Sequence, residues 1–442
     1  MAACLVLQGA LWANPVVVDS VSLDDGKNLT LEQCLAYVLD HANSISSANE
    51  KIRSHAHRLS AAKKEYLPKF LADVNFGMDQ HFDPVVFSSA GVEVPIFWSP
   101  LNVERKIAQS DLNSSKLELE TARQKLAAET KEAYFHSLYA RKLIRALQDS
   151  IRQLEGHRKV IELLYGAGRA LKVDILKVQA QLNREQIRLE KAYADQRYYD
   201  SLLNNLLDLD LNHTLNLTDE SFIPLALTLD ECYQIAEAEN PMEGIFSEKA
   251  NRAKLEVDRV KRSTLKNLKM FGKVQRQIAS YVNQNEQDHL IFGLNGNLGL
   301  WDWYQNRQFV KEKQSSYESD LKEIQDERNR LKIQVKRSYE ELDIAETEVQ
   351  AAWRLMNTLD EEYLAQKVRF EQGMIKTEDL LSTQTMLSKA RADYEKAVLE
   401  RQVAKRELYQ SMGVFETAQH EGRGLTLNDQ EFLNPLAKKS FN

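Results

Sequence analysis

The chain contains few of the residues that interrupt helices or link chain segments covalently. Its 442 residues include only 8 Pro, 16 Gly and 3 Cys. Scarce helix breakers beside 28% charged residues are typical of long helices with solvated flanks. No stretch of about 18 apolar residues occurs, which excludes a transmembrane helix. A chain of this kind could cross a membrane only as a closed β-barrel.

The same absences exclude several functional classes. The net charge of −7 is mild and Lys and Arg form no cluster, so we expect no nucleic-acid-binding surface. The motifs H-E-x-x-H, C-x-x-C, G-x-S-x-G and the Walker loop do not occur. We therefore expect a protein that is not an enzyme and carries no metal or cofactor. The nine His are scattered, and we expect them to be solvated or to line a tunnel.

The chain begins with a mostly apolar segment that ends on Ala13. This segment resembles the end of a secretory signal peptide, although the basic start of such a peptide is missing. We expect residues 1–13 to be removed from the mature chain. One alternative is an ordinary N-terminal tail. Another is a lipoprotein acylated at Cys4, although the apolar run follows that cysteine instead of preceding it.

The rest of the chain is a tandem repeat. The segment 29–34, Leu-Thr-Leu-Glu-Gln-Cys, recurs at 227–232 as Leu-Thr-Leu-Asp-Glu-Cys, an offset of 198 in the numbering. The pattern that begins at Gly168 recurs at Gly373, an offset of 205. Two landmarks with nearly equal offsets indicate one duplicated unit of about 200 residues. The predicted division is a first unit at 14–218, a second unit at 219–413 and a C-terminal tail at 414–442.

Each unit predicts the same elements in the same order. Thr30 and Thr228 are N-caps of an opening helix, with Gln33 and Glu231 at the capping-box position; the first opening helix is expected to run to about Tyr66. Period-two alternation follows and predicts a β-hairpin in each unit, with strands at about 68–98 and about 266–301. Cys34 and Cys232 lie at equivalent positions on the apolar face of the opening helices, where they are expected as core residues without a disulfide.

A very long helix and a shorter returning helix complete each unit. The first long helix is predicted over 101–165, and apolar residues with three-four spacing form a heptad seam in both long helices. At about 1.5 Å per residue, such a helix is a rod of roughly 100 Å. A Gly-containing turn precedes the returning helices at 173–208 and 378–412. The opening and returning helices together match the long helix in length, so they can lie end to end beside it.

This layout resembles the TolC family of outer-membrane efflux proteins. The resemblance covers about residues 28–413. Its motifs are the openings at 29–32 and 227–230, Tyr66-Leu67-Pro68 at the end of the first helix, Phe97-Trp98 and Leu300-Trp301-Asp302 where the hairpins rejoin the helices, and the two tips, 165–176 and 370–381. Each motif is weak alone, and their duplicated order is specific.

The resemblance implies the fold and the function. The fold is mainly α with a β-barrel portion: a homotrimer in which four strands per chain build one twelve-stranded transmembrane barrel in outer membrane lipid, above a periplasmic α-helical coiled-coil tunnel. The implied function is a passive exit duct for small molecules or ions. Its partners would be a periplasmic membrane-fusion adaptor and an inner-membrane pump of RND or ABC type. The alternative from another functional class is a soluble coiled-coil scaffold, supported by the heptad seams.

The resemblance also indicates candidate functional residues. The turns at Gly168 and Gly373 are expected to contact the adaptor. Trp98, Trp301 and Trp303 lie where strands meet helices and are expected to form an interfacial aromatic belt; core packing at the junction is the alternative.

A carboxylate ring at the periplasmic aperture is the sharpest expectation. Asp174 and Asp379 both stand at the start of a returning helix, where a negative charge favours the helix dipole. Lys177 is three residues after Asp174 and is expected to neutralise it. Ser382, the equivalent of Lys177, offers no such charge, so Asp379 is expected to form the ring.

Overall fold

The computed structural model describes residues 28–78, 84–97, 101–219, 222–263, 268–278, 287–296 and 304–415. Within them the same order of elements occurs twice. The first unit contains α1 (Leu31–His41), α2 (Asn43–Lys64), β2 (Lys69–Met78), β3 (Pro84–Phe97), α3 (Leu101–Gly166) and α4 (Lys172–Leu206). The second contains α5 (Leu229–Glu239), α6 (Pro241–Ser263), β5 (Leu268–Ile278), β6 (Gln287–Gly296), α7 (Gln305–Glu371) and α8 (Thr377–Met412). None of the described helices is long and apolar enough to cross a membrane.

Both predicted capping boxes are present. The Gln33 backbone N–H donates to Thr30 Oγ1 (3.3 Å), and the Thr30 N–H donates to Gln33 Oε1 (3.1 Å). The second box joins Thr228 and Glu231 in the same way. The prediction of one continuous opening helix to Tyr66 is wrong, because Ala42 is extended and separates α1 from α2. Asn240 makes the same break before Pro241, and a residue before proline is disfavoured in the helical region.

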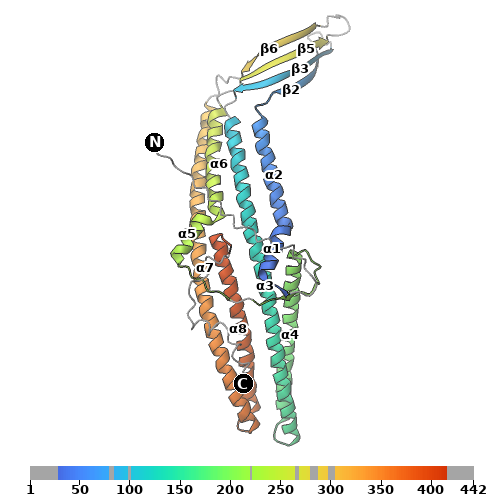
Figure 1. Cartoon of the computed structure of the whole chain (residues 1–442), viewed down its shortest axis with the longest axis vertical. Helices are drawn as coiled ribbons and strands as arrows, with labels where there is room; N and C mark the ends of the chain where they lie inside the picture. Colours follow the sequence, from blue (N-terminus) through green and yellow to red (C-terminus); the bar gives the residue numbers. More distant parts are fainter. Residues whose placement is uncertain are drawn as a thin grey trace.

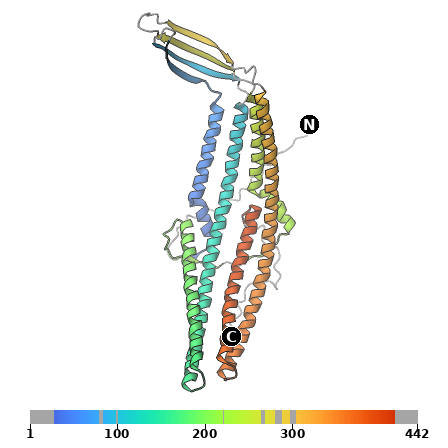
Figure 2. The same ribbon diagram turned by 180° about the vertical axis from the view of Figure 1, so that it is seen from behind.

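The helices form one elongated layer that carries the sheet at one end (Figures 1 and 2). In the half nearer the sheet, α2 packs against α3, α3 against α6, and α6 against α7. In the other half, α4 packs against α3, α3 against α8, and α8 against α7. The 66 residues of α3 and the 67 of α7 span both halves, as the matched helix lengths predicted. The two turns between long and returning helices lie together at the end far from the sheet (Figure 1).

The strands form one antiparallel sheet in the order β2-β3-β5-β6. The structure confirms a strand in the weakly patterned region near Met270. The second strand of the first unit begins at Pro84, although alternation of apolar residues is visible in the sequence only from Val92. Residues 84–91 pair with β2 throughout, so the ladder extends the strand beyond the alternating residues.

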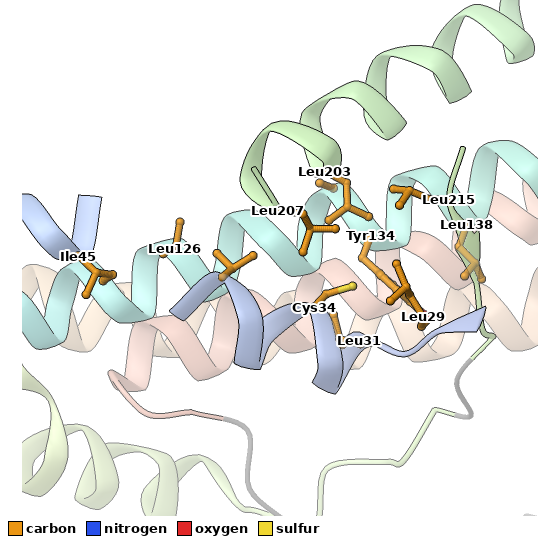
Figure 3. Close-up of a cluster of buried hydrophobic side chains, with 12 residues drawn as sticks. Leu29, Leu31, Cys34, Ile45, Leu126, Tyr134, Leu138, Leu203, Leu207 and Leu215 are labelled. Atoms are coloured by element: carbon orange, nitrogen blue, oxygen red, sulfur yellow. The ribbon is translucent and has the colours of Figure 1, made fainter. Parts of the chain in front are cut away.

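A buried tyrosine organises the middle of the molecule. Here the short strands β1 (Asn28–Leu29) and β4 (Asn216–Leu217) pair in parallel. The hydroxyl of Tyr134, on α3, lies 3.0 Å from the carbonyl oxygen of Leu29 and 2.6 Å from that of Thr218. Figure 3 shows the surrounding core, in which the thiol of Cys34 is fully buried, as predicted. Tyr134 thus ties both ends of the first unit to its longest helix.

Replacing Tyr134 by Phe should loosen this junction. The ring still fills the core, but the carbonyl oxygens of Leu29 and Thr218 lose the one proton that the hydroxyl shares between them, and within the described residues only Leu29 keeps another donor, the Thr218 N–H (3.0 Å). The change should cost about 1–3 kcal/mol of unfolding free energy. Thermal unfolding in detergent measures the loss, and hydrogen exchange should rise at residues 28–29 and 216–217. Tyr198→Phe is the matched control, because the Tyr198 side chain is exposed. Equal stability and exchange in the two variants would contradict this role.

Candidate functional site

One face of the sheet is apolar and exposed. The register aligns the same face of all four strands: Phe70 lies opposite Val92, Ala90 opposite Val274, and Met270 opposite Leu294. The apolar residues on this face are Phe70, Ala72, Val74, Phe76, Val86, Ala90, Val92, Val94, Met270, Val274, Leu290, Phe292 and Leu294. Ser88 and Arg276 lie on the same face, nearer the ends of the strands that are far from the helices. Phe70 is 83% exposed and Phe76 80%, although both are large hydrophobic residues. A contiguous patch of this kind marks an interaction with lipid or protein.

The opposite face is mostly polar. Lys269 on β5 forms an ion pair with Glu93 on β3, with Nζ 3.0 Å from the carboxylate. The Lys273 ammonium lies 5.9 Å from the centre of the Phe271 ring. The sheet therefore has one face that is compatible with lipid and an opposite face that is compatible with water. Its strands have 10 to 14 residues, and a tilted transmembrane strand needs about 9–11.

At the other end of the molecule, both predicted turns close on a left-handed glycine. Gly168 has φ 70° and Gly373 has φ 74°, a region that L side chains rarely adopt. The N–H of Arg169 donates to the Leu164 carbonyl (2.8 Å), and that of Met374 donates to the Arg369 carbonyl (2.8 Å). These are Schellman turns, and they leave both glycines exposed at the tips.

Asp174 and Asp379 cap the returning helices. The Leu171 N–H donates to Asp174 (3.0 Å) and the Lys376 N–H to Asp379 (3.3 Å). Both carboxylates thus occupy the helix-terminus position that the sequence predicted. They differ in exposure, since Asp379 is exposed whereas Asp174 is partly buried.

The expected pairing of Lys177 with Asp174 is wrong. Lys177 Nζ lies 2.8 Å from Glu378 Oε2, so the ion pair joins α4 to α8. This contact lowers the pKa of Glu378 and raises that of Lys177. Lys177 pairs with Glu378 because that residue lies across the interface between the two tips. Spacing within α4 predicts only contacts within the same helix, so it could not indicate this partner.

The two tips carry opposite charge. Segment 166–177 contains three basic residues and one acidic residue, and its equivalent 371–382 contains three acidic residues and one basic residue. Ser382 is exposed and occupies the position equivalent to Lys177. The ion pair between Lys177 and Glu378 joins a basic residue of the first tip to an acidic residue of the second. Asp379 directly follows Glu378 in the sequence.

The sequence profile of the outer membrane efflux protein family matches residues 36–203 and 252–414, which is most of the chain. The chain belongs to this family. No curated protein sequence matches it.

Solved structures show the same fold for this outer membrane efflux protein. The outer membrane channel CmeC of Campylobacter jejuni has a TM-score of 0.74 at 15% identity, over 93% of this chain and 90% of that one. VceC of Vibrio cholerae gives 0.74 at 11% identity, over 87% and 97%. The open state of MtrE from Neisseria gonorrhoeae gives 0.71 at 13% identity, over 87% and 89%.

Trp98, Trp301 and Trp303 lie outside the described residues. Within the described part of this family member, no group of His, Cys, Asp and Glu could hold a metal ion.

His157 was missed by sequence reasoning, which treated the histidines as solvated or tunnel-lining. Its side chain is buried near the tips, and Nε2 lies 2.7 Å from the hydroxyl of Tyr363 on α7. Its ring also contacts Phe370 edge-on. Burial, reinforced by the Lys367 ammonium and opposed by Glu371, lowers the pKa of His157. The signal that could have found it is its place between Leu154 and Ile161, at the three-four spacing of the heptad seam.

Acid should therefore loosen the tips of this efflux protein through His157. The folded protein keeps this imidazole neutral, so the stability it contributes is complete above its ordinary pKa of 6.5 and is lost as the pH falls through the lowered folded value. His157→Gln keeps a hydrogen-bonding group that does not titrate. We expect this variant to lose less thermal stability than wild type between about pH 7.5 and pH 5.

His57→Gln is the control, because His57 is exposed. His136, whose pKa burial also lowers, is unchanged in both variants. An acid-induced loss in His157→Gln as large as in wild type would contradict the assignment.

Proposed function

We propose that this protein is the passive outer-membrane exit duct of a tripartite efflux or secretion system, through which small molecules or ions leave the cell. The observation that carries the proposal is the sheet. One chain presents a largely apolar face on strands of membrane-spanning length, attached to helices with solvated flanks. Lipid would cover the apolar face, and the polar face would line the lumen.

Closure of the sheet supports a trimer. Four strands cannot close a barrel, and unpaired strand edges are excluded from the lipid core. Eight strands give a barrel that side chains fill, whereas a larger number leaves a lumen. Three copies give twelve strands. The helices support the same closure, because α2 and α7 lie at opposite edges of the layer, as β2 and β6 do in the sheet.

The tips support contact with a periplasmic adaptor, which would link the duct to an inner-membrane pump of RND or ABC type. The turns at Gly168 and Gly373 are exposed, and large apolar side chains around them are exposed as well, namely Leu163, Leu171, Leu176 and Met374. A solvated helix end with uncovered apolar residues suits a protein partner.

The alternative function, a soluble coiled-coil scaffold, conflicts with the sheet. A soluble protein would expose Phe70, Phe76 and Phe292 to water on one continuous face, and such a face promotes aggregation. The apolar face therefore favours the duct.

The mass of the detergent-solubilised protein tests this proposal. Light scattering corrected for detergent should give three chains. Leu294→Lys should impair membrane assembly, because a Lys at the bilayer midplane costs about 2–4 kcal/mol. Gln275→Lys, on the polar face of the inner strand β5, should assemble normally. A monomeric mass, or equal assembly of the two variants, would refute the duct.

The carboxylate ring gives a second test. Three copies of Asp379 around one axis would attract cations. Asp379→Asn should therefore reduce cation preference in planar-bilayer recordings and weaken block by multivalent cations. Asp174→Asn should do much less, because Asp174 lies in the basic tip and is partly buried. Unchanged selectivity and block in both variants would leave Asp379 only its capping role.

A further inference from the structure

The two outer strands of the sheet are the least covered. Each of β2 and β6 pairs on one side only in the described sheet. Phe76 on β2 is 80% exposed and Phe292 on β6 is 74%, compared with 50% for Met270 and 48% for Val274 on the inner strand β5. An unpaired edge with large apolar side chains requires a further strand, and the proposed closed sheet supplies it from a second copy of the chain.

The internal duplication provides a template for that junction. The β3–β5 ladder joins the second strand of the first unit to the first strand of the second unit. The missing junction joins β6, the second strand of the second unit, to β2, the first strand of the first unit in the next copy. If all junctions of a closed sheet are equivalent, the register of one determines the register of the other.

Two offsets relate the strands of the two units. The first strands follow the N-caps Thr30 and Thr228, whose sequence numbers differ by 198. The second strands precede α3 and α7, which begin at Leu101 and Gln305, and these numbers differ by 204. Both offsets are even, as the shared apolar face requires.

The hairpins check these offsets independently. In the first hairpin, Ala72 lies opposite Ala90. Adding 198 to the first number and 204 to the second gives positions 270 and 294. The structure places Met270 opposite Leu294.

We infer that β6 pairs antiparallel with β2 of a neighbouring copy, with Asn295 opposite Asn75 of that copy. The template is the pair Gly91 and Lys273 in the β3–β5 ladder. Adding 204 to position 91 gives position 295, and subtracting 198 from position 273 gives position 75. The same operation on Ala90 and Val274 sets Leu294 opposite Phe76.

This register matches the chemistry of both faces. Leu294 meets Phe76 on the apolar face, and Asn295 meets Asn75 on the polar face. A shift by one residue would set Leu294 opposite Asn75 and mix the faces. Each carboxamide offers a donor and an acceptor, so the two Asn side chains can hydrogen-bond across the junction between copies.

Cysteine cross-linking tests the register and rests on the proposed closed sheet. The variant Asn75→Cys with Asn295→Cys, oxidised in the membrane, should give linked dimers and trimers in denaturing electrophoresis without reductant. The shifted pairs, Asp73→Cys or Gly77→Cys with Asn295→Cys, displace one thiol by about 6.6 Å along the strand, beyond disulfide reach. We expect the matched pair to react at least about tenfold faster.

The single variants control for the native cysteines, of which Cys34 and Cys232 are buried. Faster reaction of a shifted pair would overturn the register while the joined sheet stands. No cross-linking in a protein whose mass corresponds to three chains would overturn the β6–β2 contact itself. A monomeric mass would instead remove the proposed duct, and the inference with it.

Discussion

The structure depends on one constraint, the pairing of a sheet whose apolar face has no cover within the described part of its own chain. Because side chains alternate with a period of two, a common register across four strands keeps every apolar residue of that face on one side and Glu93, Lys269 and Lys273 on the other. Neither side resembles the interior of a globular protein. The sheet is suited to lie between an apolar and an aqueous medium. Its outer strands, β2 and β6, each pair on one side only in the described sheet, and this is the basis for proposing that the sheet continues in another copy.

The helices place this sheet at one end of an elongated helical layer. α3 and α7 run without interruption, whereas their neighbours are split into an upper and a lower helix. This division leaves helix ends in the middle of the molecule, where backbone N–H and C=O groups have no partner within a helix. The β1–β4 pair and the hydroxyl of Tyr134 satisfy them in the first unit. The middle of the molecule is thus the place where sequentially distant segments are fastened together.

The tips at the far end are fastened differently. The two turns carry opposite net charges, and Lys177 and Glu378 form an ion pair between them at the surface. An exposed ion pair contributes little stability, so the buried contact of His157 with Tyr363 and the surrounding apolar core hold α3 and α7 in place behind it. The end proposed to meet the adaptor therefore combines a firm core with exposed, charged turns.

The sequence by itself determined the elements and their duplicated order. Periodicity, the caps at Thr30 and Thr228, and the glycines of the turns act within a few residues of the chain, so they can be read without the fold. The helix break at Ala42 was missed because no proline or glycine marks it. Only the tertiary structure decided that β3 pairs with β5, that Lys177 pairs with Glu378 instead of Asp174, and that His157 is buried against Tyr363. In each of these pairs the two partners come from different repeat units. Which side chains meet across the units depends on the rotation and offset of whole helices and strands against one another, and local sequence patterns do not specify these.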